Sequence, residues 1–214
     1  PHEFFPVHRI YCVGRNYAKY AIEAGGTGRD VPFFFMKPAD AVLPVASGSV
    51  GEMPYPPVTN DLHHEIELVV KINKVGKYIE PKFAHKYYDE ISVGIDFTAR
   101  DLQDQLKSKG LPWEKAKAFD GSAVIGEFLS KEQFASLDDV NFELLKNGAV
   151  AQKGNSSLML WKIDELVAYV SQFFTLKIGD IIFTGTPEGV AAVQPNDVLE
   201  GYLEGQQLFR IQVK

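Results

Sequence analysis

Short, β-prone runs separated by turn residues are the feature that most restricts how this chain can fold. Val, Ile, Phe and Tyr are concentrated in these runs, and Gly, Pro, Asn or Asp bounds each of them, as expected of strands. The runs are RIYCVG, FFFMK, HEIELVVKI, ISVGID, FELLKN and GDIIFTG. We therefore predict an α+β, β-rich fold. A single domain over residues 1–214 is expected, because a chain of 214 residues supports one substantial core.

Two stretches have helical character. In TARDLQDQLKSKG, residues 98–110, Thr98 and Asp101 stand three apart like a capping box, and Gly110 is a plausible stop. The second stretch carries an apolar stripe with helical spacing, which we assign to the core. Its members are Ile163, Leu166, Val167, Val170 and Phe174. Segment 44–59 is rich in Pro and Gly and is expected to be a surface loop.

Composition argues against several classes of partner. The net charge is −6 and no basic cluster is present, which disfavours a nucleic-acid partner. No apolar run approaches the length of about 20 residues that spans a bilayer, so no membrane partner is expected. The beginning of the sequence, PHEFFPVHRIYCVG, resembles neither a signal nor a transit peptide. The lone Cys12 stands in an apolar run, fits a buried thiol, and favours a reducing, cytoplasmic location.

Two glutamates stand close together in DLHHEIELVV, residues 61–70. Alternate side chains of a strand face the same side, so Glu65 and Glu67 would share one face with His63 and Val69. Two parallel carboxylates suit a cation site. The same pattern fits a half-buried strand with its charged face in water, and this run alone favours that second interpretation.

A third carboxylate, Asp96, lies in the middle of the apolar run EISVGIDFTARD, where Gly94 leaves space beside it. A buried ionised Asp is costly unless it is paired with a base or binds a metal. Two interpretations therefore stay open. Asp96 forms an ion pair, with Arg100 as the obvious base, or it shares a cation with Glu65 and Glu67.

Three carboxylates without paired cysteines suit a hard cation that prefers oxygen, such as Mg²⁺ or Mn²⁺. Mg²⁺ usually keeps several waters and takes few protein ligands, which leaves positions for a chelating substrate. Zinc prefers Cys and His, so His63 and His64 keep zinc as an alternative. The predicted metal ligands are Glu65, Glu67 and Asp96.

Several strings together resemble the fumarylacetoacetate hydrolase family, in its small single-domain branch of acylpyruvases and oxaloacetate decarboxylases. They are GRNYA, FMKP, HHEIEL, DFTARDLQ, GLPWEKAKAFD, GDIIFTGTPEGV and FRIQVK, in the family's order from about residue 9 to the C-terminus. The resemblance implies a mixed β-sandwich roll, a homodimer, and a metal bound by Glu65, Glu67 and Asp96. The substrate-binding residues that it implies are Arg15, Arg100, Gln103, Lys117 and Thr186.

These implied roles are chemically reasonable. Arg100 can give planar, two-pronged hydrogen bonds to a carboxylate, and Gln103 follows about one helical turn later. Lys117 beside a metal could bind a substrate carboxylate or stabilise an enolate oxygen, although a lysine in KAKAF more often belongs to a solvated face. TGTPEGV, residues 184–190, is by itself a common turn, in which Thr186 supplies a hydroxyl.

The sequence departs from the family at one position. Hydrolytic members carry a His and a Glu in a pattern like G-R-N-Y-x-x-H-x-x-E, whereas this chain has Tyr20 and Glu23 there. A tyrosine with an ordinary pKa of about 10 is a poor base at neutral pH. On a helix Tyr20 and Glu23 would share a face. We expect Glu23 to orient water with help from Tyr20, and Lys117 is an alternative.

The resemblance implies a Mg²⁺- or Mn²⁺-dependent hydrolase that cleaves a C–C bond in an acylpyruvate-type 2,4-dioxo acid, with Glu23, Lys117 and Tyr20 as catalytic residues. Decarboxylation of oxaloacetate, or keto–enol isomerisation of a related 2-oxo acid, is the alternative if Tyr20 prevents water activation. A third possibility is a non-catalytic binder of metal and dicarboxylates. The last is a soluble β-rich domain with a coincidental acidic patch.

Overall fold

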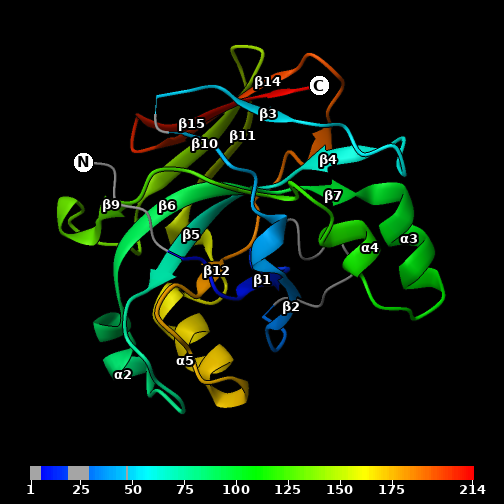
Figure 1. Ribbon diagram of the computed structural model, residues 1–214. Helices are drawn as coiled ribbons and strands as arrows, with labels where there is room; N and C mark the ends of the chain where they lie inside the picture. The colour runs from blue at the N-terminus through cyan, green and yellow to red at the C-terminus, as the bar shows by residue number, and fades with distance from the viewer. Residues whose placement is uncertain (1–5, 19–28, 47) are drawn as a thin grey trace.

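Strands from distant parts of the sequence pair at the centre of the molecule (Figure 1). The computed structural model describes residues 6–18, 29–46 and 48–214. Within these residues the strands form three sheets, of seven, five and three strands. The strand-rich architecture confirms the predicted α+β, β-rich class.

The seven-stranded sheet has the order β2-β1-β12-β5-β6-β8, with β9 also paired to β6. Its strands are β1 (Ile10–Gly14), β2 (Phe33–Lys37), β5 (Ile66–Ile72), β6 (Tyr88–Asp96), β8 (Ala123–Ile125), β9 (Leu129–Ser130) and β12 (Ile181–Phe183). The five-stranded sheet contains β3 (Gly51–Met53), β10 (Asn141–Lys146), β11 (Ala149–Asn155), β14 (Val198–Leu203) and β15 (Gln206–Val213). The small sheet contains β4 (Leu62–His64), β7 (Thr98–Ala99) and β13 (Ala191–Ala192). Each β-prone run of the sequence therefore contributes a strand.

Strands β5 and β6 lie inside the seven-stranded sheet and are buried on both faces. The half-buried interpretation of the 61–70 run is therefore wrong, because Glu67 is 1% exposed and Glu65 is 5% exposed. The continuous strand assumed for this run is also wrong. Glu65 separates β4 from β5, and the two strands belong to different sheets.

One large core cluster joins the two main sheets to a helix. It includes Leu68 of β5, Ile95 of β6, Phe142 of β10 and Ile211 of β15. Leu166 of helix α5 (Ile163–Phe173) belongs to the same cluster, and the predicted apolar stripe is thereby confirmed as core. Figure 1 shows α5 beside α2 (Pro81–Ala84) at the end of the molecule away from the five-stranded sheet.

Helices α3 (Arg100–Ser108) and α4 (Glu114–Lys117) lie together beside β4 and β7 (Figure 1). The predicted capping box is wrong, because Thr98 lies in β7 and the N-cap residue of α3 is Ala99. Asp101 instead accepts hydrogen bonds from the backbone amides of Asn60 and Leu102. The predicted stop is confirmed at Gly110, whose φ is +64°.

The prediction of a surface loop over segment 44–59 is wrong for Gly51–Met53. These residues form β3, which pairs in parallel with β15 at the edge of the five-stranded sheet. Cys12 is fully buried in β1, as predicted. Within the described residues, no helix combines the length and the apolar character needed to cross a membrane.

Candidate metal and substrate site

Three carboxylates meet where β5 and β6 run side by side. The antiparallel register pairs Glu67 with Gly94, and the amide of Asp96 donates to the carbonyl of Glu65. One carboxylate oxygen from each of Glu65, Glu67 and Asp96 lies within 4.8 Å of the other two. All three residues are buried, so the strand pairing concentrates three acidic groups in a small volume away from bulk water.

Two buried lysines contact this cluster. Lys117 Nζ donates to Asp96 Oδ2 at 2.8 Å, to Glu65 Oε2 at 3.0 Å and to Thr98 Oγ1 at 2.6 Å. Lys37 Nζ lies 2.7 Å from Asp96 Oδ1, as an ion pair without hydrogen-bond geometry. Sequence reasoning did not assign a role to Lys37, although a lysine that ends the apolar run FFFMK is a recognisable signal.

Arg100 forms an ion pair with Glu65. The predicted ion pair between Arg100 and Asp96 is wrong. Arg100 Nη2 donates to Glu65 Oε1 at 2.6 Å, and its Nη1 donates to the side-chain carbonyl of Gln103. Asp96 finds its ion-pair partners in Lys37 and Lys117. Salt bridges therefore exist at this site, and Lys117 joins Glu65 and Asp96 through them. Glu67 remains close to both carboxylates.

The surrounding charges shift the pKa values of Glu65 and Glu67 in opposite directions. Burial would raise the pKa of Glu65, but Lys117 and Arg100 outweigh it and lower that pKa to about 2. Burial, with the nearby charges of Asp96 and Glu65, raises the pKa of Glu67 well above its usual value. Burial would lower the pKa of Lys117, but Asp96 and Glu65 hold it above its ordinary range. Lys117 is therefore a stable ammonium group.

A backbone amide binds the carboxylate of Glu67. Its Oε2 accepts a hydrogen bond from the amide of Gly185 at 2.8 Å, in the turn that follows β12. Gly185 has φ +105°, and a Cβ there would come within 2.7 Å of Asn16 Cβ, so the turn requires glycine. The next residue, Thr186, is buried and accepts from Gln152 Nε2 at 2.9 Å. The TGTPEGV turn thus positions both a carboxylate and a hydroxyl.

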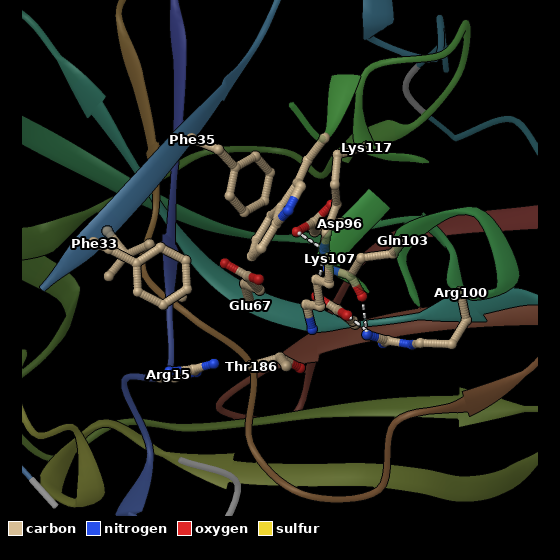
Figure 2. A pocket seen from close by; sticks show the side chains of 14 residues that line it. Arg15, Phe33, Phe35, Glu67, Asp96, Arg100, Gln103, Lys107, Lys117 and Thr186 are labelled. Atoms are coloured by element: carbon tan, nitrogen blue, oxygen red, sulfur yellow. Dashed lines mark hydrogen bonds and ion pairs between the residues drawn. The ribbon is translucent and has the colours of Figure 1, made fainter. Parts of the chain in front are cut away.

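The triad lines a pocket together with residues of α3, β2 and the turn after β12. Figure 2 shows this pocket from close by. Aromatic rings make up one side of it: Phe33 and Phe35 of β2 and Trp113 before α4. Arg100, Gln103, Lys107, Lys117 and Thr186 also line it, together with Arg15, whose φ is +55°. All five predicted substrate-binding residues therefore lie on one cavity.

The remaining predicted residues are Tyr20, Glu23, His63 and His64. Tyr20 and Glu23 lie outside the described residues. His64 is buried and bonds Gln152 through Nδ1 at 2.8 Å, and His63 bonds Asp61 at 2.8 Å. Neither histidine lines the pocket, so the zinc alternative loses its proposed ligands.

The donor set fits a hard divalent cation. It consists of three buried carboxylates, and oxygen ligands of this kind suit Mg²⁺ and Mn²⁺. Within the described residues, Asp96 Oδ1 accepts no hydrogen bond, and Glu67 has no cation at ion-pair distance. A dication would compensate Glu67, the carboxylate that the surrounding lysines and arginine leave unbalanced.

Comparison with known proteins places this site in a family. Residues 9–214 match the model of the fumarylacetoacetate hydrolase C-terminal domain. The mitochondrial oxaloacetate tautomerase of Rattus norvegicus is 38% identical over 205 residues, which cover 96% of this chain and 91% of that protein. The mitochondrial oxaloacetate decarboxylase of Dictyostelium discoideum is 38% identical over 197 residues, covering 92% and 89%.

A solved structure matches the whole chain. It is the fumarylpyruvate hydrolase of Pseudomonas aeruginosa in complex with Mn²⁺ and pyruvate, with 43% identity and a TM-score of 0.94. The match covers 100% of this chain and 92% of that one.

Proposed function

The chain belongs to the fumarylacetoacetate hydrolase family, and from that premise we propose that it is a Mg²⁺- or Mn²⁺-dependent hydrolase that cleaves a C–C bond in an acylpyruvate-type 2,4-dioxo acid. The observation that carries this proposal is the buried triad of Glu65, Glu67 and Asp96 with the ammonium group of Lys117 in direct contact. The similarity to a fumarylpyruvate hydrolase that binds Mn²⁺ and pyruvate supports both the metal and the substrate class.

In this proposal Glu65, Glu67 and Asp96 hold the dication. When bound, a divalent cation acts as a Lewis acid that polarises the 2-oxo group of the substrate. Arg100 and Gln103, adjacent on one face of α3, bind the carboxylate beside that oxo group. Lys117 keeps its proton and stabilises the negative charge that develops on oxygen as the C–C bond breaks. Thr186 offers a further hydroxyl.

Hydrolysis also needs a base that activates water. We assign this role to Glu23, with Tyr20 as a hydrogen-bond donor that orients the water. The phenol, with an ordinary pKa of about 10, stays protonated at neutral pH and cannot replace a histidine as base. Water activation therefore depends on a single carboxylate in this chain.

Tautomerisation or decarboxylation of oxaloacetate is the second candidate. The specific observation in its favour is Tyr20 at the position of the family's histidine, because stabilising an enolate does not require an activated water. The similarity to oxaloacetate tautomerases and to a decarboxylase supports it independently.

Assays of purified protein with 2,4-dioxo acids and with oxaloacetate, in Mg²⁺, Mn²⁺ or chelator, test the proposal. We expect metal-dependent release of pyruvate from the dioxo acid, lost with chelator. If dioxo acids are cleaved no faster than by the metal alone, the hydrolase proposal is wrong. If oxaloacetate is converted instead, the second candidate replaces it.

The variant Tyr20→His separates the two candidates further, and Glu132→Gln at an exposed position is its matched control. A rise in hydrolysis alone indicates that the native reaction needs no activated water. We also propose that the chain forms a homodimer, to be tested by light scattering in solution. A cytoplasmic location likewise stays a prediction.

A further inference from the structure

We propose that the outer rim of the pocket is a second anion site, in which Lys107 and Arg15 bind a distal carboxylate and so select dianionic over monoanionic 2-oxo acids. This inference rests on the proposed function, since it requires the inner wall to hold the 2-oxo acid end. It assigns Lys107, a residue without a role so far, to substrate specificity.

Lys107 continues a line of pocket residues along α3. Arg100, Gln103 and Lys107 are spaced i, i+3 and i+7, which places them on one face of the helix. All three line the pocket. Their backbone positions span about 10 Å along the helix axis. One helix face therefore presents a guanidinium near the triad and an ammonium group at the mouth.

Aromatic rings hold both rim cations. Lys107 Nζ lies 5.3 Å from the ring centroid of Trp113, and Arg15 Cζ lies 5.5 Å from that of Phe33. The two rings contact each other edge-on with centroids 5.8 Å apart. Stacking on a ring fixes a long cationic side chain without using its hydrogen-bond donors. Those donors stay available for a ligand.

The rim cations differ from the inner ones in their partners. Lys117 and Arg100 pair with triad carboxylates. No carboxylate within the described residues forms an ion pair with Lys107 or Arg15. Figure 2 shows the Lys107 amine and the Arg15 guanidinium directed into the pocket, with Arg15 on the opposite side from Arg100. Asp104 acts on Lys107 by its charge and without an ion pair. Within the described residues, the rim therefore carries positive charge that no ion pair neutralises.

The charge balance of the pocket favours an anion at the rim. Partial burial, followed by the charge of Arg100, lowers the pKa of Lys107; Asp104 opposes this effect, and Arg15 and Lys117 add to it. The cations thus repel one another. A dication on the triad would add to this repulsion, and a carboxylate at the rim would relieve it.

The rim specifies a class of substrate. An anion at Arg100 and another at Lys107 fit the two ends of an extended oxo dicarboxylate, whose middle would lie along Trp113 and Phe33. A short diacid such as oxaloacetate would place both carboxylates near the triad. A monoanionic acylpyruvate would leave the rim unfilled. The inference therefore points to a long dianionic 2-oxo acid.

Binding of two unreactive probes tests the inference. 2-Oxoadipate and 2-oxohexanoate have the same chain length and differ in the terminal carboxylate. We expect calorimetry with the Mn²⁺-loaded protein to show at least tenfold tighter binding of 2-oxoadipate, about 1.4 kcal/mol. In Lys107→Gln this preference should fall to about threefold or less, with 2-oxohexanoate affinity within about twofold of the unsubstituted protein.

Lys109→Gln is the matched control, because Lys109 is an exposed lysine two residues away that does not line the pocket. It should keep the full preference, and Lys107→Glu should reverse it. Equal binding of both probes by the unsubstituted protein, or an unchanged preference in Lys107→Gln, would overturn the inference and leave the proposed function standing. If neither 2-oxo acid binds the Mn²⁺-loaded protein, both fall.

Discussion

The inner and outer walls of the pocket are both cationic, but they are built differently. On the inner wall the ammonium group of Lys117 is 3% exposed and hydrogen-bonded to two carboxylates. On the outer wall Lys107 is exposed and rests on the ring of Trp113. The inner cations form buried ion pairs with the triad, whereas the outer cations contact aromatic rings. Substitutions should therefore change stability and metal binding on the inner wall, and chiefly substrate choice on the outer one.

The largest effect is expected at Asp96. In the unsubstituted protein, the ammonium groups of Lys37 and Lys117 lie 2.7 Å and 2.8 Å from the oxygens of Asp96. Asp96→Ala removes this shared carboxylate. Removing one partner of a buried ion pair costs about 3–5 kcal/mol. Urea denaturation of the metal-free protein should show that loss. Asp104→Ala, on the exposed side of α3, is the control. Equal urea midpoints of unfolding for Asp96→Ala and Asp104→Ala would show that the ion pairs of the inner wall do not stabilise the protein.

A smaller effect on stability but a large one on metal binding is expected at Glu67. The charges that act on it most strongly are those of Asp96 and Glu65, and a neutral amide removes their repulsion. Glu67→Gln should therefore unfold at the same urea concentration as the unsubstituted protein, or a higher one. Its Mn²⁺ affinity should fall at least ~100-fold, or about 2.7 kcal/mol. Unchanged Mn²⁺ binding by calorimetry would remove Glu67 from the metal site.

The smallest of the three effects is expected on the outer wall. Trp113→Leu removes ring contacts to Phe33 and Phe35, which are worth about 1 kcal/mol in total. We expect KM to rise several-fold with little change in kcat, because in our proposal the ring contacts the acyl part between the bond that breaks and the distal carboxylate. A fall in kcat equal to that caused by triad substitutions would erase the distinction between the walls.

The sequence predicted the composition of the inner wall better than its geometry. A buried carboxylate such as Asp96 needs a base or a metal, and that argument left an ion pair and a shared site with Glu65 and Glu67 both open. The family resemblance implied the shared site. Strand alternation could not show that β4 ends before Glu65, since the break depends on pairing with a different sheet. Lys37 was missed because its partner stands 59 positions later in the chain.

Lys107 was missed for another reason. Its i, i+7 spacing from Arg100 was visible, but a lysine in the last turn of a helix is already explained by the helix dipole. To assign Lys107 to the pocket as well, one must know which face of α3 lines the pocket. The pocket includes Phe33 and Phe35 of β2, which stand far from α3 in the sequence and contact Trp113 only in the folded protein. Secondary structure followed from local runs at β1, β2, β5, β6, β10, β12 and α5, whereas no predicted run covered strands such as β8, β11 and β14.

A crystal structure with Mn²⁺ and oxalate tests the central claim most directly. We predict one ion bound by oxygens of Glu65, Glu67 and Asp96, with oxalate completing its coordination on the side of Arg100. A structure with the triad still closed around Lys117 and no ion, or with Mn²⁺ bound elsewhere, would contradict the account.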